Sequence, residues 1–376
     1  MKTNSSPIRL HVQNLLRNNP KAMIRWKALV VGAAKRTEWL NHLLNTPHGF
    51  GLFATMGDVA GGCEDLEAKL RRHGVELGTV KLSRKNSPKF ELKKPGETSP
   101  LNAVFASIRK ESPADDWSQL MRGCDWRSEA VTRFLASMRE RPLPDTIKEQ
   151  MIEDSLVQSF SRSKKNGRFW FNYCALAEPS AVGQVFPFKF NLPIIVDQGN
   201  ARAIRSGRWN ELINPTEDYG APDILVRCQK VLGNGRKRLG IVELKKERSN
   251  HAEVSLLQGY AYAVAISELQ KIYAENQPVL KALRTLLGYS AGQPATIPLA
   301  VYALVEQGDV DVVKHEKNLL TKAVLSECGS ILVGVLGYEL NKETKQMKLT
   351  SAVQWVKGGW KDIKRSATRE TVSLVA

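Results

Sequence analysis

Two apolar stretches near the middle of the chain constrain its fold more than any other feature, because each carries acidic residues. The stretch YGAPDILVRCQK at 219–230 places Asp223 directly before an apolar run. The stretch RLGIVELKKERS at 238–249 places Glu243 and Lys245 inside one. Both have the composition of β-strands, and a charged group in a buried strand is costly unless it is paired or binds a metal. These three residues are therefore candidates for a functional site.

The link between the two stretches carries its own signal. Asn234-Gly235 lies between them and favours a β-hairpin with a two-residue turn. That turn would pair residue 223 with residue 246 and put Asp223 on the opposite sheet face from Glu243 and Lys245. A site that uses all three residues needs the register shifted by one, through an odd-length loop or a β-bulge. We therefore expect an irregularity in this hairpin.

The chemistry of the three side chains points to a metal. Asp223 and Glu243 supply the hard oxygen ligands that Mg²⁺ or Mn²⁺ prefers. Glu243 and Lys245 are two residues apart in a strand, so they share one face. A metal lowers the pKa of bound water, and a neighbouring ammonium offsets transition-state charge, so the set favours phosphodiester hydrolysis. The alternative is a hairpin with exposed charges.

These residues also resemble a known family. Pro222-Asp223 followed by Glu243-Leu244-Lys245 resembles the signature of the PD-(D/E)xK, or restriction-endonuclease-like, nuclease superfamily. The string GAPD that ends at Asp223 resembles the GxxD element of its RecB-like branch, and Gln258 with Tyr262 resembles the QxxxY element. Other acidic-x-Lys patterns occur in the chain, but only this one follows a Pro-Asp strand start and precedes a helix. The histidine that this branch often carries is missing, because no histidine lies between residues 75 and 250.

The resemblance implies an architecture and a set of roles. It implies an αβββαβ core with a mixed central sheet flanked by helices, over roughly residues 145–310. Asp223, Glu243 and the backbone carbonyl of Leu244 would be the metal ligands. A third acidic group would come from the first helix, where Glu153 is the choice and Glu149 lies one turn earlier. Gln258 and Tyr262, four residues apart on one helix face, would line the site and contact substrate; the alternative is an amphipathic helix edge.

The elements around these motifs fit that order. Asp145 has the character of an N-cap and opens a predicted helix over 145–162. A long helix is predicted over 252–273, and further strands over 296–306 and 330–340. We therefore predict an α/β fold.

The N-terminal region suggests a different module. Predicted helices over 35–45 and 63–74 precede two predicted strands within 78–94, an order that resembles a winged helix. Under that interpretation one group of cations faces a DNA groove: Lys69, Arg71 and Arg72. A second group lies on the wing: Arg84, Lys85 and Lys89. The alternative is a small α/β packing domain with solvated lysines.

Prolines near residues 139–149 mark the clearest boundary. We predict a basic N-terminal α+β domain over 1–110, a helical connector over 111–144, a nuclease domain over 145–345 and a basic extension over 346–376.

Charge is distributed unevenly along the chain, whose net charge is +17. Residues 1–110 hold 19 Lys and Arg against 8 Asp and Glu, and residues 341–376 hold 8 against 3. Residues 111–340 are nearly neutral, with 28 against 27. Basic ends favour a polyanion such as DNA, although solubility alone is the alternative. No lipidation signal suggests a membrane partner.

The five cysteines are scattered without a CxxC motif, which indicates neither a zinc site nor a disulfide framework and fits a reducing cytoplasm. The sequence thus predicts a Mg²⁺-dependent (or Mn²⁺-dependent) deoxyribonuclease, an endonuclease of a defence, repair or mobile-element system. The alternatives are a non-catalytic DNA-binding protein on a nuclease-like fold and a nuclease subunit of a larger complex. RNA stays open as a substrate, and a homodimer would supply two active sites for double-strand cleavage.

Overall fold

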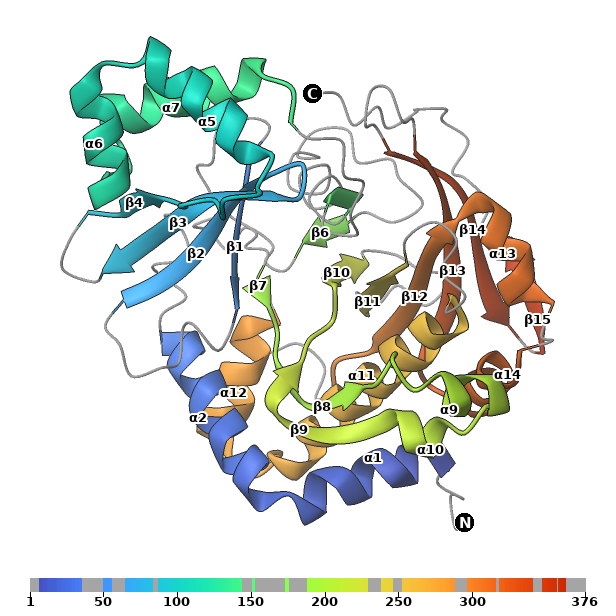
Figure 1. Cartoon of the computed structure of the whole chain (residues 1–376). Helices are drawn as coiled ribbons and strands as arrows, with labels where there is room; N and C mark the ends of the chain where they lie inside the picture. Colours follow the sequence, from blue (N-terminus) through green and yellow to red (C-terminus); the bar gives the residue numbers. More distant parts are fainter. Residues whose placement is uncertain are drawn as a thin grey trace.

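The molecule is built around two sheets and a short two-stranded ribbon (Figure 1). The computed structural model describes residues 7–35, 50–55, 65–83, 87–143, 151–152, 173–175, 188–228, 238–245, 252–287, 296–315, 318–340, 347–356 and 358–362. Among the described helices, none combines the length and the apolar composition that crossing a membrane requires.

The larger sheet has seven strands in the order β15-β14-β13-β12-β11-β10-β6. Their bounds are β6 Tyr173–Ala175, β10 Ile224–Cys228, β11 Arg238–Leu244, β12 Leu299–Glu306, β13 Leu332–Leu340, β14 Met347–Val356 and β15 Gly359–Asp362. The neighbours β11, β12 and β13 run parallel, whereas the other pairs are antiparallel. The central strands β11 and β12 are buried almost throughout, as expected for parallel strands covered on both faces. The predicted α/β class with a mixed sheet is confirmed.

One long helix organises the packing beside this sheet. Helix α11 contacts β11 and β12 and also the ribbon strand β8. It is apolar nearly all round, which is typical of a helix buried in a core. The helices of this half are α1 Pro7–Asn18, α2 Pro20–Lys35, α9 Ala201–Ser206, α10 Trp209–Leu212, α11 Ala252–Ile272, α12 Gln277–Leu286, α13 Gln307–Lys314 and α14 Leu319–Glu327. The ribbon consists of β8 Leu192–Val196 and β9 Ile213–Gly220, paired antiparallel.

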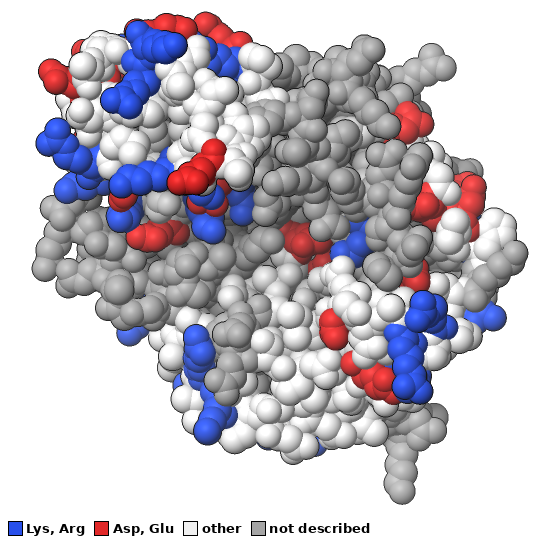
Figure 2. All heavy atoms as spheres, viewed as in Figure 1, with Lys and Arg blue, Asp and Glu red and all other residues white. Residues whose placement is uncertain are grey.

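The second sheet has six strands in the order β5-β4-β3-β2-β1-β7 and forms a separate lobe (Figure 1, upper left). Its strands are β1 Gly51–Thr55, β2 Asp65–Arg72, β3 Val75–Ser83, β4 Lys89–Leu92, β5 Cys124–Asp125 and β7 Phe188–Lys189. Its helices are α5 Leu101–Glu111, α6 Ala114–Arg122 and α7 Glu129–Glu140. Figure 2 shows Lys and Arg side chains gathered over this lobe, with acidic side chains beside them. We call this unit the basic lobe.

The predicted winged helix is wrong. The segment expected to be a helix over 63–74 is strand β2. Ala68 and Leu70 are buried while Glu67 and Lys69 are exposed, and this period of two is that of a half-buried strand. Gly74, expected to stop a helix, forms with His73 the turn into β3, with φ angles of 76° and 48° that suit a tight hairpin. Most of the predicted helix over 35–45 lies outside the described residues.

The packing does not follow the predicted domain boundaries. Helix α2 packs against α12, and α1 packs against α11, so the first helices belong with the larger sheet. Helices α6 and α7 pack on strands of the basic lobe rather than linking two domains. Strands β14 and β15 extend the larger sheet, so residues 347–362 are part of it rather than an appended tail. The prolines expected to separate the domains lie at 142, which is described, and at 144, which is not.

Candidate active site

The hairpin of β10 and β11 has a register that suits a shared site, but the expected β-bulge is not found, because its five described pairs are consecutive. Ile224 pairs with Val242, three residues away from the pairing that a two-residue turn at 234–235 would give. The two-residue turn is therefore wrong. Described pairing ends with Cys228 opposite Arg238, and residues 229–237, an odd number, join the strands. Continuing the register by one residue sets position 223 opposite position 243, and opposed residues share a face in an antiparallel pair.

Asp223 is fixed by the backbone of the neighbouring strand. Its half-buried carboxylate accepts a hydrogen bond from the backbone N–H of Leu244, with 2.9 Å between Oδ2 and N. The next N–H, that of Lys245, points the other way and donates to Leu304 at 3.0 Å. Because the N–H and C=O of one strand residue point to the same side, the carbonyl of Leu244 faces the Asp223 side of β11.

Glu243 is the most unusual side chain of the site. It is fully buried, and neither carboxylate oxygen accepts a hydrogen bond from a described residue. Burial raises its pKa well above the ordinary value, and the negative charge of Asp223 raises it further. Lys245 lowers it, and the nearby Asp223 also acts on it through its side chain and its backbone N–H, although neither comes within ordinary hydrogen-bond geometry of the Glu243 oxygens. A buried carboxylate without a close hydrogen bond is costly, so this position indicates a partner that the described residues do not supply. A divalent cation fits the two carboxylates and the adjacent carbonyl.

Lys245 is held by a glutamine that sequence analysis missed. Lys245 is only 5% exposed. Its ammonium donates a hydrogen bond to Oε1 of Gln198, with 3.0 Å between the two atoms. The amide of Gln198 then donates from Nε2 to Oε1 of Gln258 at 2.6 Å. Gln198 therefore joins strand β11 to helix α11 through two hydrogen bonds. The signal in the sequence was the polar pair Asp197-Gln198 directly after the apolar run of β8.

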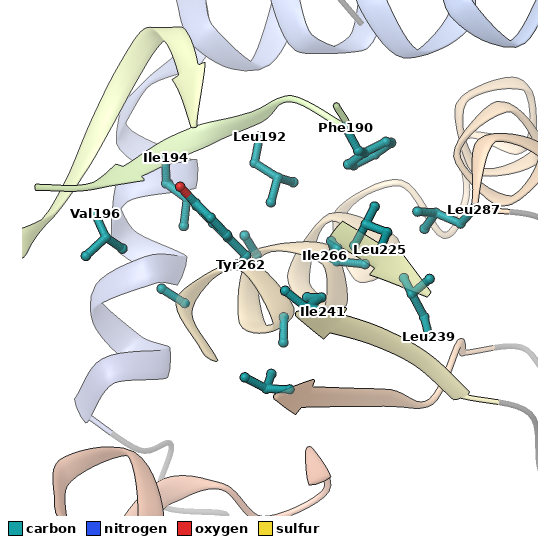
Figure 3. Close-up of a cluster of buried hydrophobic side chains, with 14 of the residues drawn as sticks. Phe190, Leu192, Ile194, Val196, Leu225, Leu239, Ile241, Tyr262, Ile266 and Leu287 are labelled. Atoms are coloured by element: carbon teal, nitrogen blue, oxygen red, sulfur yellow. The ribbon is translucent and has the colours of Figure 1, made fainter. Parts of the chain in front are cut away.

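Gln258 and Tyr262 both lie in the buried part of α11, but they have different surroundings. Gln258 joins the row of hydrogen bonds that begins at Lys245. Tyr262 is 1% exposed, and its side chain points toward Ile194 on β8 (Figure 3). Burial, followed by the negative charge of Glu243, raises its pKa far above the ordinary value. Tyr262 thus supports the wall between α11 and the ribbon, while Gln258 lies nearer the charged groups.

Glycines permit the close approach of these elements. A Cβ at Gly220 would lie 2.1 Å from the carbonyl oxygen of Ile194 and 2.8 Å from the hydroxyl of Tyr262. A Cβ at Gly259 would lie 2.6 Å from Cγ1 of Val301 and 3.3 Å from Cγ of Glu243. The first glycine of the GAPD string therefore lets β9 pass Tyr262.

The residues expected to contact DNA divide into three groups. Lys69 and Lys89 are exposed on strands of the basic lobe. Arg71 and Arg72 are each 9% exposed and contact the protein itself. Arg71 lies over the ring of Phe53, at 4.6 Å from its centroid. Arg84 and Lys85 lie outside the described residues, as do the acidic candidates Glu149 and Glu153.

Arg72 has a structural role. Its guanidinium donates to the carbonyl oxygens of Arg139 and Arg141, both at 2.7 Å. Burial, and then the positive charge of Arg139, lower its pKa. These bonds tie the end of α7 to strand β2, so the expectation that Arg72 faces a DNA groove from a helix does not match this position.

The described residues contain no group of three or more His, Cys, Asp or Glu side chains arranged to hold a metal ion. Within the described residues Asp223 and Glu243 are thus a pair of acidic side chains only, and a metal held there would need a further ligand such as a backbone carbonyl. Comparison of the chain with protein-family models, with curated proteins and with solved structures gives no significant match to any of them. The case for function therefore depends on the geometry of the site.

Proposed function

We propose that this protein is a metal-dependent nuclease that hydrolyses phosphodiester bonds in DNA, with a restriction-endonuclease-like core formed by β10, β11, α11 and β12. The observation that carries the proposal is Glu243, a fully buried carboxylate whose oxygens accept no hydrogen bond from the described residues. Continuing the register of β10 and β11 by one residue sets Asp223 opposite it, and Lys245 follows two residues later, directly after β11. A buried hairpin with merely structural charges would satisfy that carboxylate instead.

Asp223, Glu243 and the carbonyl of Leu244 would hold Mg²⁺ or Mn²⁺. When bound, the metal supplies Lewis acidity toward a phosphoryl oxygen and lowers the pKa of a water molecule. In the hydrolysis the oxygen of water forms a bond to phosphorus and gives up a proton to solvent, while the bond from phosphorus to the leaving sugar oxygen breaks and that oxygen takes up a proton from solvent. Lys245 offsets the negative charge that develops at phosphorus.

Gln198 gives Lys245 its direction. An ammonium group has three donors on a flexible stem, so a fixed acceptor reduces the number of its orientations. The hydrogen bond of 3.0 Å from Lys245 to Gln198 provides that acceptor, and Gln258 fixes the Gln198 amide in turn.

DNA is the substrate that the charge distribution supports. The net charge of +17 favours a polyanion, and exposed cations gather on the basic lobe (Figure 2). The phosphodiester is also the group for which two carboxylates, a metal and an ammonium are suited.

Cleavage assays test the proposal directly. Supercoiled plasmid, linear duplex and single-stranded DNA would each be incubated with Mg²⁺, with Mn²⁺ or with EDTA. We expect cleavage that EDTA abolishes and that Glu243→Gln, purified identically, lacks. Plasmid nicking would establish an endonuclease, because a closed circle has no ends. Tight binding without cleavage on every substrate and with both metals would support a non-catalytic DNA-binding protein instead.

A further inference from the structure

A second site lies in the basic lobe, on elements that contribute nothing to the Asp223 site. It is a pocket of about 600 Å³, open to solvent, between α5, α6 and the segment that follows β4. That volume falls within the range of about 300–1,000 Å³ that is typical of small-ligand sites. The pocket is formed entirely by residues 93–121.

The floor of the pocket is aromatic and apolar. Phe105 from α5 is buried, whereas Trp117 and Met121 from α6 are half-buried and line the open space. Trp117 meets Phe105 edge to face, with 6.0 Å between ring centroids. This contact fixes the indole of Trp117 against the core and leaves part of it accessible from the pocket.

The rim of the pocket is positively charged. Lys93, Lys94, Arg109 and Lys110 line it, and the described lining residues include no acidic side chain. Lys93 pairs with Glu76 at 3.1 Å. Within the described part of the chain the other three cations form no ion pair, so their charge is available to a ligand.

Two of the three acidic residues on α5 and α6 are already engaged, and the third, Asp115, is exposed and does not line the pocket. Glu111, at the end of α5, pairs with Arg141. Asp116, in the first turn of α6, accepts from Arg133 at 2.7 Å. The pocket therefore keeps an uncompensated positive rim around an aromatic floor.

We propose that this pocket binds an unpaired DNA segment, with one base against Trp117 and Met121 and the flanking phosphates on Lys94, Arg109 and Lys110. A flat base fits an aromatic floor, and phosphates fit adjacent cations. In a duplex the faces of the bases are stacked on one another, so only an unpaired base can occupy the floor. The pocket argues for an unpaired nucleic acid, and the choice of DNA rests on the proposed nuclease function.

The test measures binding without cleavage, so that it can fail independently of the nuclease activity. Fluorescein-labelled dT20 and a labelled 20-base-pair duplex would be titrated with the full chain in EDTA, and binding followed by fluorescence anisotropy. We expect Trp117→Ala to weaken dT20 binding about ten-fold and to change duplex binding less than two-fold.

The rim has its own variants. Arg109→Ala with Lys110→Ala should weaken dT20 binding and reduce the slope of log K against log salt by about 1.4, for two phosphates on a single strand. The matched control removes the same charge from exposed residues of α2, through Lys27→Ala with Lys35→Ala, and should leave the dT20 affinity within two-fold.

Folding is controlled in two ways. Thermal unfolding would show whether Trp117→Ala is folded, and Trp117→Phe, which keeps an aromatic face, should retain most of the affinity. The rim residues Arg109 and Lys110 are exposed, so their variants test the site even if the tryptophan variant unfolds.

Three results would overturn the proposal. The first is wild-type dT20 affinity in the rim double variant. The second is equal binding of the duplex and dT20 by the wild type, together with equal reductions for both in Trp117→Phe or the rim variant. The third is tighter, Trp117-dependent binding of rU20 or of an acidic peptide that contains phenylalanine, which would identify RNA or a protein as the ligand.

Discussion

The two sheets of this molecule handle charge in opposite ways. In the larger sheet, Glu243 on β11 and Lys245, directly after that strand, are 0% and 5% exposed and lie beside the apolar residues of β11. In the basic lobe, Lys81 pairs with Glu67 and Glu91 across neighbouring strands, in full contact with solvent. The exposed pairs follow from sheet geometry and cost little, whereas the buried pair carries a large desolvation cost. Charge that is expensive to bury is therefore the better indicator of a chemical role.

The difference has a quantitative side. Exposed ion pairs are worth about 0–1 kcal/mol, because water and salt screen them. Burial of an ionised group costs several kcal/mol of desolvation free energy, which other interactions must offset. Substitutions in the two regions should therefore differ in size and in their dependence on salt, and this contrast can be tested in order of expected effect.

The largest effect is expected for the carboxylates. Asp223→Asn and Glu243→Gln each remove a charged metal ligand, and we expect cleavage to fall by at least about 10³-fold, since the metal supplies several kcal/mol of transition-state stabilisation. Initial rates on linear DNA under excess Mg²⁺ would measure this reduction. DNA affinity in EDTA should stay near the wild-type value, and a variant that cleaves at the wild-type rate would show that the site lies elsewhere.

Lys245→Ala should come next. We expect a reduction of about 10²–10³-fold in cleavage rate, because one electrostatic interaction with the transition state is removed. The metal ligands remain, so Mn²⁺ binding measured by calorimetry should persist, unlike in Glu243→Gln. The matched change in the adjacent residue, Lys246→Ala, should keep the wild-type rate. The opposite pattern would mean that the lysine was assigned to the wrong position.

Gln198→Leu should have a smaller effect of a specific kind. Residues that orient a catalytic group contribute about 10–100-fold, and we expect a reduction of that size in kcat with KM little changed. The exposed neighbour Arg202 on α9 offers a control, through Arg202→Ala. An increase in KM alone would indicate that Gln198 binds substrate rather than holding Lys245.

The metal-free protein should show a stability that depends on pH. Burial raises the pKa of Glu243 above its ordinary value of 4.5 in the unfolded chain, so its contribution to stability is full below that value and is lost as pH rises toward the higher folded-state pKa. In EDTA we expect Tm to fall over this window, and Glu243→Gln to reduce that fall. At pH 8, Mg²⁺ should raise Tm of the wild type but not of this variant; the same slope in both proteins would exclude Glu243 as its origin.

The smallest effects are expected for the basic lobe. Lys69→Ala with Lys89→Ala should weaken duplex binding a few-fold and reduce its salt slope by about 0.9 for each phosphate that is no longer neutralised. Arg72→Ala provides the contrast, since removal of its two backbone hydrogen bonds should lower the free energy of unfolding by about 1–3 kcal/mol. Anisotropy titrations and urea unfolding would measure both. If Arg72→Ala reduced the salt slope of DNA binding and left the free energy of unfolding unchanged, Arg72 would be a DNA-contacting residue after all.

The sequence predicted the elements around Asp223 and Glu243 well, because those motifs are short and their apolar context is local. It did not predict the register, which depends on the length of the connection after Cys228 rather than on Asn234-Gly235. It missed Gln198, since nothing local connects a polar residue after β8 to a lysine on β11.

The N-terminal half failed for a different reason. Residues 65–72 alternate between apolar and charged residues over too short a span to exclude a helix, and tertiary pairing with β3 decides the outcome. The arginines of this segment seemed suited to phosphates, yet Arg72 bonds carbonyl groups at the end of α7. Net charge shows how many cations a chain has, but only packing shows which of them face solvent.

Gly259 has a consequence for how this site can change over generations. Its missing side chain sets the separation between α11 and the sheet, and thereby the depth of the Glu243 carboxylate. A methyl group at 259 would meet Cγ1 of Val301 at 2.6 Å, so an alanine there becomes acceptable only together with a smaller residue at 301. Positions 259 and 301 should accordingly vary as a linked pair among descendants of this chain, and a lineage in which both have changed should hold its carboxylate at a different depth.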